Sequence, residues 1–342
     1  MITKRQLENA TCVLDPSHFR YPLFTVTYSV VLVLGLPLNA VSLWCLFRRL
    51  KLQSVPVVYM TNLAISDLLF VLSLPLRIYY FSTATWPFGQ ILCMVPGTLF
   101  SVNIYSSSLF ITLISVDRFL AVVYPLRSRA IRTTKFAAIA CGSVWVFILG
   151  LSIPVALNHS TSYDTCHNIT RCFESFSPNS WYFGFIILCL ITGVGILIPF
   201  VIIASSTLVV IWKIRNETHC SMPDNKKKIT RMFIANLLMY AFCFIPFHAA
   251  FILYGLYKLD IIAYNFLDIQ TITMCFASAN SCLDPIIYYF VLRAFKKRKD
   301  DNLELRTLRT SVLQSLEVHN NSIFLHHSLS NYDAKLFVCK TV

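Results

Sequence analysis

Charged residues are scarce in this sequence. They make up 13% of its 342 residues, whereas 56% of the residues are hydrophobic. A soluble globular domain has about 25% charged residues. The composition therefore excludes an ordinary soluble domain and predicts a chain that lies mostly within a membrane.

Signs of an intramembrane enzyme or of a transporter are also missing. An enzyme needs a nucleophile–base pair or a metal cluster, and the histidines at positions 159, 167 and 248 do not have the spacing of helical metal ligands. Internal repeats, which are typical of transporters, are absent. We therefore expect neither an enzyme nor a transporter.

The first residues, MITKRQLENATC, lack the apolar core of a cleavable signal peptide. We therefore expect the first apolar segment of the chain to act as its own insertion signal.

Seven apolar segments are long enough to cross a bilayer core of about 30 Å as helices. They must be helical because lipid offers no partner to exposed backbone polar groups. The expected spans are residues 22–48, 56–82, 90–123, 135–157, 179–213, 226–257 and 262–290. The predicted fold is all-α, a seven-transmembrane helix bundle over residues 22–290.

Three further segments surround this bundle. Residues 1–21 form an N-terminal tail, and VLRAFKKRK with its neighbour, residues 291–300, is typical of a short amphipathic eighth helix on the inner leaflet. Residues 301–342 are polar and are expected to be a disordered tail with Ser and Thr sites for phosphorylation and arrestin binding.

Lys and Arg gather in alternate loops, which sets the orientation. Four such groups are predicted to face the cytoplasm: Arg48, Arg49 and Lys51; Arg127, Arg129, Arg132 and Lys135; Lys213, Arg215 and Lys226–Lys228; and Arg293 with Lys296–Lys299. The N-terminus is then extracellular and the protein belongs in the plasma membrane. The net charge of +13 indicates acidic membrane lipids and a cytoplasmic protein as partners, and no nucleic acid.

Four cysteines fall on the predicted outer side: Cys12, Cys93, Cys166 and Cys172. The even number indicates two disulfides, with three possible pairings. Three glycosylation sequons, at Asn9, Asn158 and Asn168, also fall outside.

Polar side chains inside the spans are costly and mark candidate sites. They are Asn39, Asp67, Ser107, Asn280 and Asp284. If these residues meet in the bundle, Asp67 needs a cation or a proton, and a sodium ion with Ser107 and Asn280 nearby would serve. A water-filled hydrogen-bond network without a specific ion is the alternative.

Asp117 and Arg118 stand side by side in ISVDRFLAVVYPL, at the inner end of the third span. An arginine at the bilayer centre costs about 2.5–3.5 kcal/mol on insertion scales. We therefore expect the pair to lie at the membrane edge, with Asp117 as the anion of Arg118.

Taken together, these motifs resemble the rhodopsin-like (class A) G-protein-coupled receptors over residues 20–300. The matching elements are Asn39, LAISD with Asp67, WPF at 86–88, Cys93, DRF at 117–119, Trp145, Pro199, FCFIP at 242–246 and DPIIY at 284–288. Three positions depart from the usual pattern: Phe119 replaces tyrosine, Phe244 replaces tryptophan and Asp284 replaces asparagine.

The resemblance implies a switch that acts on heterotrimeric G proteins. Arg118 would leave Asp117 and meet the G protein when the sixth span swings outward. Pro246 would be the hinge, with Phe244 coupling the ligand to it, and Tyr288 would fill the opened cavity. The facing end of the sixth span offers lysines and no acid, so we expect no salt bridge between it and Arg118.

Residue types that certain spans lack exclude two classes of ligand. Residues 262–290 contain no lysine for a retinal Schiff base, and the outer half of the third span contains no acid for an amine. That side instead carries basic groups without matching acids, which indicates an anionic ligand. They are Arg77, deep in the second span, and Arg20, Lys258, Arg171 and His159.

The chain resembles the purinergic-like branch, and within it the lysophosphatidic acid receptors, most of all the fifth subtype. The segments that carry this likeness are LGLPLNA, VYMTNLAISDLLFVLSLPLRIYY, RCFESFSPNSW and ANLLMYAFCFIPFHAAFILYGL. In nucleotide receptors of this branch a basic residue usually follows the histidine at the position of His248 by three residues, and this chain lacks that base. Tyr105 and Phe251 indicate an apolar pocket. The resemblance implies that Arg77 and Lys258 clamp a lysophospholipid phosphate with help from Arg20, and that Cys12 pairs with Cys166. Nucleotides, leukotrienes and platelet-activating factor remain alternatives.

Overall fold

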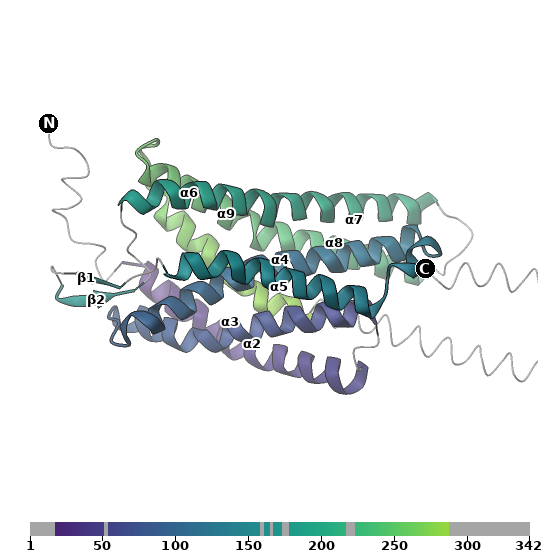
Figure 1. Ribbon diagram of the computed structural model, residues 1–342, viewed down its shortest axis with the longest axis horizontal. Coiled ribbons are helices and arrows are strands. Elements are labelled where there is room, and N and C mark those ends of the chain that lie inside the picture. The colour runs from purple at the N-terminus through teal and green to yellow at the C-terminus, as the bar shows by residue number, and fades with distance from the viewer. Residues whose placement is uncertain are drawn as a thin grey trace, which may run out of the picture.

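The computed structural model describes residues 18–50, 54–157, 161–164, 167–172, 178–216 and 223–286. In these ranges the chain is almost entirely helical, and its long helices run side by side along the longest axis (Figure 1). The spans are α2 (Arg20–Leu50), α3 (Val55–Thr83), α4 (Gly89–Val123), α5 (Thr134–Leu157), the unit α6 (Pro178–Thr192), η2 (Gly193–Leu197) and α7 (Ile198–Asn216), the pair α8 (Pro223–Cys243) and α9 (Ile245–Lys258), and a helix over residues 267–286.

The predicted seven-helix bundle is therefore confirmed. Most boundaries agree within a few residues, but the last helix begins at residue 267 and not at 262. The predicted eighth helix (291–300) and C-terminal tail (301–342) lie outside the described residues, as does most of the N-terminal tail (1–21).

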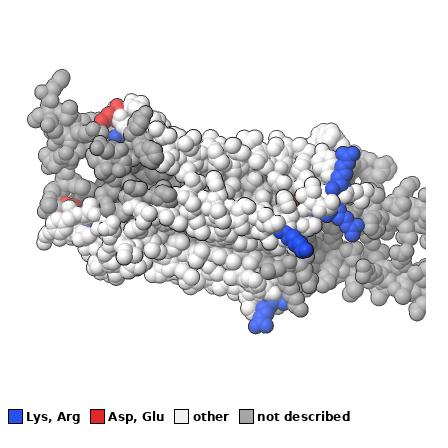
Figure 2. Space-filling model, viewed as in Figure 1, with Lys and Arg blue, Asp and Glu red and all other residues white. Residues whose placement is uncertain are grey.

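Two short elements mark the ends of the bundle. An antiparallel hairpin of β1 (Ser162–Asp164) and β2 (Ile169–Arg171) covers one end, which we call the hairpin end (Figure 1). The turn η1 (Arg127–Ala130) follows α4 at the opposite end. Figure 2 shows blue Lys and Arg side chains gathered at the end that carries η1, which we call the basic end. A long uncharged surface lies between the two ends.

The uncharged surface is that of a membrane protein. Six helical segments in the described part of the chain are long and apolar enough to cross a membrane. Large apolar side chains point outward along them, among them Val33, Val146 and Trp212 at 65–76% exposure. In water such a surface would be costly, whereas lipid solvates it at no cost.

α3 and α4 form the centre of the bundle. Their buried faces carry polar side chains as well as apolar ones, whereas α2 and α5 expose most of their apolar surface. Cross-links between helices are hydrogen bonds: Trp145 of α5 donates to Asn62 of α3 at 2.9 Å, and Asn39 of α2 donates to the Ser281 carbonyl at 2.7 Å. In the apolar interior such bonds fix which helix faces meet.

Two spans are interrupted where the sequence disfavours a regular α-helix. In the unit of α6 and α7, residues Gly193–Leu197 form a π-helical turn just before Pro199. Between α8 and α9 the helix breaks at Phe244, because Pro246 at the start of α9 has no N–H for the preceding turn. π-Turns and proline breaks free backbone carbonyls for other partners.

Candidate ligand cavity and switch residues

Asp117 and Arg118 meet at the basic end, as expected from the sequence. Arg118 donates from Nε to Asp117 Oδ2 at 2.9 Å, with a second, shorter contact from Nη2. Arg132, which follows η1, also donates from Nε to Asp117 Oδ1 at 2.8 Å. The buried carboxylate of Asp117 therefore accepts hydrogen bonds from two guanidinium groups. Arg132 was not predicted as a partner of Asp117, because this contact depends on how the chain folds back after η1.

Hydrogen bonds also join α4 to α7 and α8 near this end. Asn236 of α8 donates to Ser115 of α4 at 2.8 Å, and Lys213 of α7 donates to the Val123 carbonyl at 2.6 Å. The hydrogen bond from Asn236 to Ser115 therefore joins side chains of α4 and α8 without a charged group.

The buried polar residues come together in the middle of the bundle. Asn103 of α4 donates to Asp67 Oδ1 at 2.9 Å and reaches Ser107 at 3.5 Å. Asn280 donates to Asp284 at 2.8 Å, and Asp284 interacts with Asp67. Asp67, Ser107, Asn280 and Asp284 therefore lie in one cluster, and Asn39 is linked to it through Ser281, whose carbonyl accepts from Asn39 and whose hydroxyl lies near Asn103. Asn103 is the member that the sequence analysis overlooked, although an asparagine in the apolar run FSVNIYSSS was a visible signal.

This cluster has more acceptors than donors. Asp67 Oδ2, Asn39 Oδ1 and Asn280 Oδ1 are buried and have no hydrogen-bond partner within the described residues. Oxygen acceptors left over around a carboxyl group suit a hard cation or water. Three or more grouped His, Cys, Asp or Glu side chains, as a transition-metal site needs, do not occur in the described ranges.

Tyr240 and Ser108 connect three helices at the hinge. The Ser108 hydroxyl lies 2.6 Å from the Gly195 carbonyl and 2.6 Å from the Tyr240 hydroxyl, which lies 3.0 Å from the Ile196 carbonyl. Both carbonyls belong to the π-helical turn. Tyr240 also packs against Phe244, with ring centroids 4.8 Å apart. We call this group the hinge latch: Ser108, Tyr240 and the carbonyls of Gly195 and Ile196.

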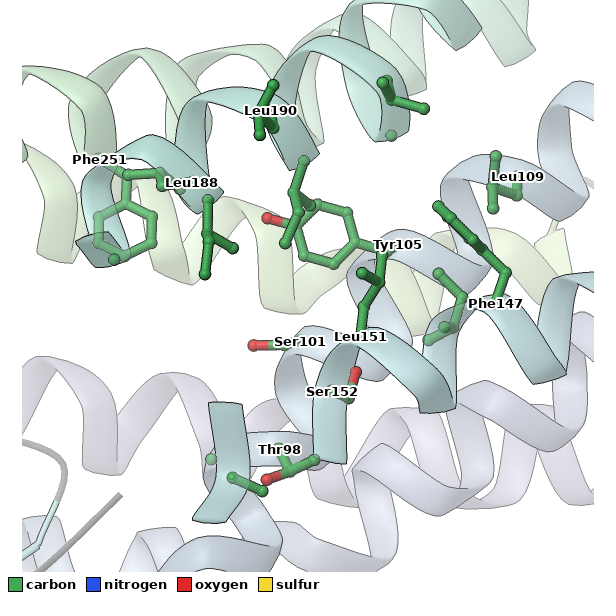
Figure 3. A pocket seen from close by; sticks show the side chains of 18 of the residues that line it. Thr98, Ser101, Tyr105, Leu109, Phe147, Leu151, Ser152, Leu188, Leu190 and Phe251 are labelled. Carbon is green, nitrogen blue, oxygen red and sulfur yellow. The ribbon is translucent and has the colours of Figure 1, made fainter. Parts of the chain in front are cut away.

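An apolar cavity of about 440 Å³ lies between α4, α5, α6 and η2, with Phe251 of α9 at its side (Figure 3). Its walls are mostly aliphatic and aromatic. The few polar side chains are Thr98, Ser101, Tyr105 and Ser152. Leu151, Leu190 and Val194 line it and are also 37–63% exposed on the lipid-facing surface, so the cavity lies at the perimeter of the bundle. In the described residues α5 makes few contacts with α6, which leaves this gap.

Tyr105 stands in the cavity wall, and its hydroxyl lies 3.3 Å from His248 Nε2 (Figure 3). His248 Nδ1 lies 2.8 Å from the Phe244 carbonyl. A carbonyl only accepts, so Nδ1 carries the hydrogen and Nε2 of the neutral ring accepts from Tyr105. Tyr105 and Phe251 line the cavity, and their contact with a ligand stays a prediction. His248 lies behind Tyr105 and links it to the hinge.

Arg77 is buried between α2, α3 and α4. Its Nη2 and Nε donate to the Pro96 carbonyl at 3.0 and 3.3 Å, and Nη1 donates to the Tyr28 hydroxyl at 3.3 Å. The guanidinium also stands 5.2 Å from the Phe100 ring centroid. Arg77 does not line the cavity; it faces another side of α4 at the level of the first cavity residues.

Two other predicted basic residues lie near aromatic rings at the hairpin end. Arg20 stands 5.8 Å from the Phe24 ring centroid, and its charge acts on Arg77. Lys258 stands 5.7 Å from the Tyr254 ring centroid. Arg20 and Arg77 repel each other across α2 and α3, and together they make this region positively charged.

For Arg171 the expectation of a base without a matching acid is wrong. Its Nη2 lies 2.7 Å from Asp164 Oδ2 across the hairpin, and Nη1 donates to the Tyr21 hydroxyl of α2. Arg171 is fully buried. It therefore fastens the hairpin to α2, and the acid seven residues earlier in the sequence was the signal that we missed.

The hairpin has a second attachment. Cys172, directly after β2, forms a disulfide with Cys93 of α4, which is one of the possible pairings and is now confirmed. Asn168 is exposed at the hairpin turn and is therefore accessible, and its glycosylation stays a prediction. His159, Cys12, Cys166, Asn9, Asn158 and Tyr288 lie outside the described residues.

Comparison with known proteins gives a family. The family model for the 7 transmembrane receptor (rhodopsin family) matches residues 38–288. The chain is 42% identical to human lysophosphatidic acid receptor 4 over 87% of this chain and 82% of that protein. It is 40% identical to mouse lysophosphatidic acid receptor 5 (80% and 76%) and 36% identical to human lysophosphatidic acid receptor 6 (93% and 94%). These identities do not single out the fifth subtype.

Proposed function

The chain belongs to the rhodopsin family of seven-transmembrane receptors, and from this premise we propose that it is a cell-surface receptor for an extracellular lysophospholipid, with lysophosphatidic acid as the first candidate. On binding, it activates heterotrimeric G proteins. The observation that carries this proposal is the apolar cavity at the lipid-facing perimeter, at one level with a buried guanidinium.

The cavity suits one acyl chain. It extends along α4 from Gly97 to Leu109, which is about 18 Å at 1.5 Å per residue. One leaflet of a bilayer core of about 30 Å is about 15 Å deep, the length of one lipid chain. A nucleotide would find few polar partners among these walls, because a base and a triphosphate need several hydrogen bonds.

Arg77 is the proposed partner of the phosphate. In the structure it donates to the neutral Pro96 carbonyl, next to the cavity residue Gly97. A charge-assisted bond to phosphate is about twice as strong as a neutral one, so an arriving head group would draw the guanidinium away from this carbonyl. Arg20 adds positive charge from α2, and Lys258 does so from α9. Phosphate binding by these three residues would connect α2, α3 and α9 through one ligand.

The basic end is the proposed G-protein site. The contacts of Asp117 with Arg118 and Arg132 represent the resting arrangement, in which the acid keeps both bases in place. An outward swing of α8 at the Phe244 break would let Arg118 leave Asp117 and meet the G protein. The positive-inside rule supports a cytoplasmic basic end and an extracellular hairpin end, the orientation proposed for a receptor of the plasma membrane. Acidic lipids and arrestin are its further proposed partners on that side.

A sodium ion at Asp67 is a further part of this proposal. The buried oxygens around Asp67 without partners in the described residues fit a hard cation, and Ser107 lies in the same network. Such an ion would balance one negative charge of the Asp67–Asp284 pair and would hold the helices of the resting bundle together.

Nucleotide exchange on purified G proteins tests the function. The receptor is reconstituted in lipid nanodiscs and exposed to lysophosphatidic acid, a nucleoside triphosphate, a leukotriene and platelet-activating factor. We expect lysophosphatidic acid to stimulate exchange. Stimulation by the nucleotide alone would show that the receptor binds nucleotides and would contradict the proposal. Stimulation by a leukotriene or by platelet-activating factor alone would show that the lipid ligand has a different head group from lysophosphatidic acid.

A further inference from the structure

Two glycines lie against aromatic side chains of the cavity wall, and we propose that Gly255 and Gly195 determine which acyl chains the receptor accepts. This inference rests on the proposed function, because it concerns the part of the same cavity that holds the acyl chain. It adds the residues that set the width of that part.

Gly255 of α9 controls the position of Phe185. A β-carbon on Gly255 would lie 2.5 Å from Phe185 Cδ2 and 2.7 Å from Cε2. Carbon atoms pack at about 3.5–4.0 Å, so the ring would have to move. Phe185 belongs to α6 and lines the cavity, and the open space beside it is the cavity itself. The glycine therefore lets the ring lie back against α9 and keeps the cavity wide.

Gly195 has the same relation to Tyr105, farther from the hairpin end. A β-carbon there would lie 3.1 Å from Tyr105 Cδ1. The shift required of the ring is a few tenths of an ångström, smaller than at Gly255. Tyr105 also contacts His248, so its position is constrained on both sides. Gly195 thus sets the width of the inner part of the cavity.

Shape is the property by which this cavity can discriminate acyl chains. A chain that enters from the bilayer leaves one apolar solvent for another and gains little hydrophobic free energy. Selectivity among chains must then come from close packing, and a wall that is one methyl group too thick is strongly unfavourable. The two glycines determine where the aromatic rings of the wall lie. The positions of these rings therefore determine which acyl chains fit the cavity.

The experiment measures binding directly, by the thermal stability of the purified full-length receptor in detergent. It uses lipids with an oleoyl or a myristoyl chain, each with a phosphate, a phosphocholine or a free carboxylate head. In Gly255→Ala we expect the apparent affinity for the oleoyl lipid to fall about tenfold and that for the shorter myristoyl lipid to fall less than about threefold. Gly195→Ala should give a smaller change in the same direction.

Matched variants separate cavity shape from helix stability. Gly142→Ala and Gly150→Ala add the same methyl group where no heavy atom lies within 4 Å of the new β-carbon, and neither glycine lines the cavity. Both should keep the wild-type ranking of chains. Adding Phe185→Leu to Gly255→Ala removes the displaced ring and should restore oleoyl binding, as a coupled pair does in a double-mutant cycle.

Each outcome decides a separate point. If wild type binds the lipids and neither Gly255→Ala nor Gly195→Ala changes the ranking of chains, the inference is overturned and the proposed function stands. If all three heads bind alike while Gly255→Ala still selects against oleoyl, the inference holds and the phosphate assignment falls. If no acyl lipid stabilises the wild-type receptor, both are overturned.

Discussion

The substitution Tyr240→Phe tests whether the hinge latch restrains the receptor in its resting form. Tyr240 contributes one hydroxyl to the latch, and phenylalanine keeps the ring that packs against Phe244 and Phe200. Packing is therefore preserved, and the change is confined to hydrogen bonds.

The magnitude follows from counting hydrogens. Three contacts, Ser108 to Gly195 O, Ser108 to Tyr240 and Tyr240 to Ile196 O, share two hydroxyl hydrogens, so two bonds exist at a time. Without the Tyr240 hydroxyl, Ser108 can still donate to Gly195 O, so one bond is lost. One net hydrogen bond contributes about 0.5–1.5 kcal/mol, and a buried acceptor left unsatisfied adds to this cost. A loss of about 1–2 kcal/mol from the resting form alone raises the ratio of active to resting receptor about 5- to 30-fold.

Ligand-independent nucleotide exchange on a G protein measures this ratio, with thermal unfolding recorded on the same samples. Tyr240→Phe should raise basal exchange and lower the thermal stability of the unliganded receptor. Tyr264→Phe, which removes a hydroxyl from an exposed ring, should change neither. Ser108→Ala should raise basal exchange too, and the double variant should fall short of the sum because the two residues share one network. A loss of stability without any rise in basal exchange would refute the reasoning, because the latch would then hold the fold and not the switch.

Four other substitutions test the remaining sites. Arg77→Gln should reduce the potency of lysophosphatidic acid about 10- to 100-fold at unchanged surface expression, since a charged hydrogen bond contributes about 1.5–3 kcal/mol; equal potency would exclude Arg77 from the head-group site. Asp164→Asn should lower the free energy of unfolding by about 3–5 kcal/mol in a thermal or denaturant assay, because it removes the carboxylate that pairs with the buried Arg171 across the hairpin; a loss below about 1 kcal/mol would contradict the assigned role. Asp67→Asn should abolish any effect of sodium, compared with potassium, on agonist affinity, and a sodium effect that persists would place the ion elsewhere. Asp117→Asn should raise basal nucleotide exchange, since it weakens the hold on Arg118, and unchanged exchange would show that this contact does not restrain the switch.

Several features of the site were predictable because they depend on local chemistry. A carboxyl group such as that of Asp67 inside an apolar span needs polar partners. In the structure Asn103, Asn280 and Asp284 form the polar cluster around it. Asp117 and Arg118 are neighbours in sequence, so their contact requires no knowledge of the fold. The break at Phe244 follows from Pro246, whose missing N–H has the same effect in any helix.

Other features depended on partners that are distant in sequence. Arg171 seemed to be a free base at the mouth of a pocket, but the hairpin register brings Asp164 to it. Arg77 and the apolar cavity were expected in one place, yet they lie on different sides of α4, since the rotation of a helix about its axis depends on its neighbours.

The sequence by itself determined that seven apolar helices span the membrane, where their polar residues fall along each span, and which loops are basic, because these properties depend only on composition over about 20 residues at a time. Tertiary structure alone decided that the cavity opens between α4, α5 and α6, that Asn103 and Arg132 complete the two acidic sites, and that glycines on α9 and η2 set back the rings of Phe185 and Tyr105. The reason is that lipid satisfies an apolar helix face as well as another helix does, so hydrophobicity leaves the pairing of faces open and only packing and buried hydrogen bonds select it.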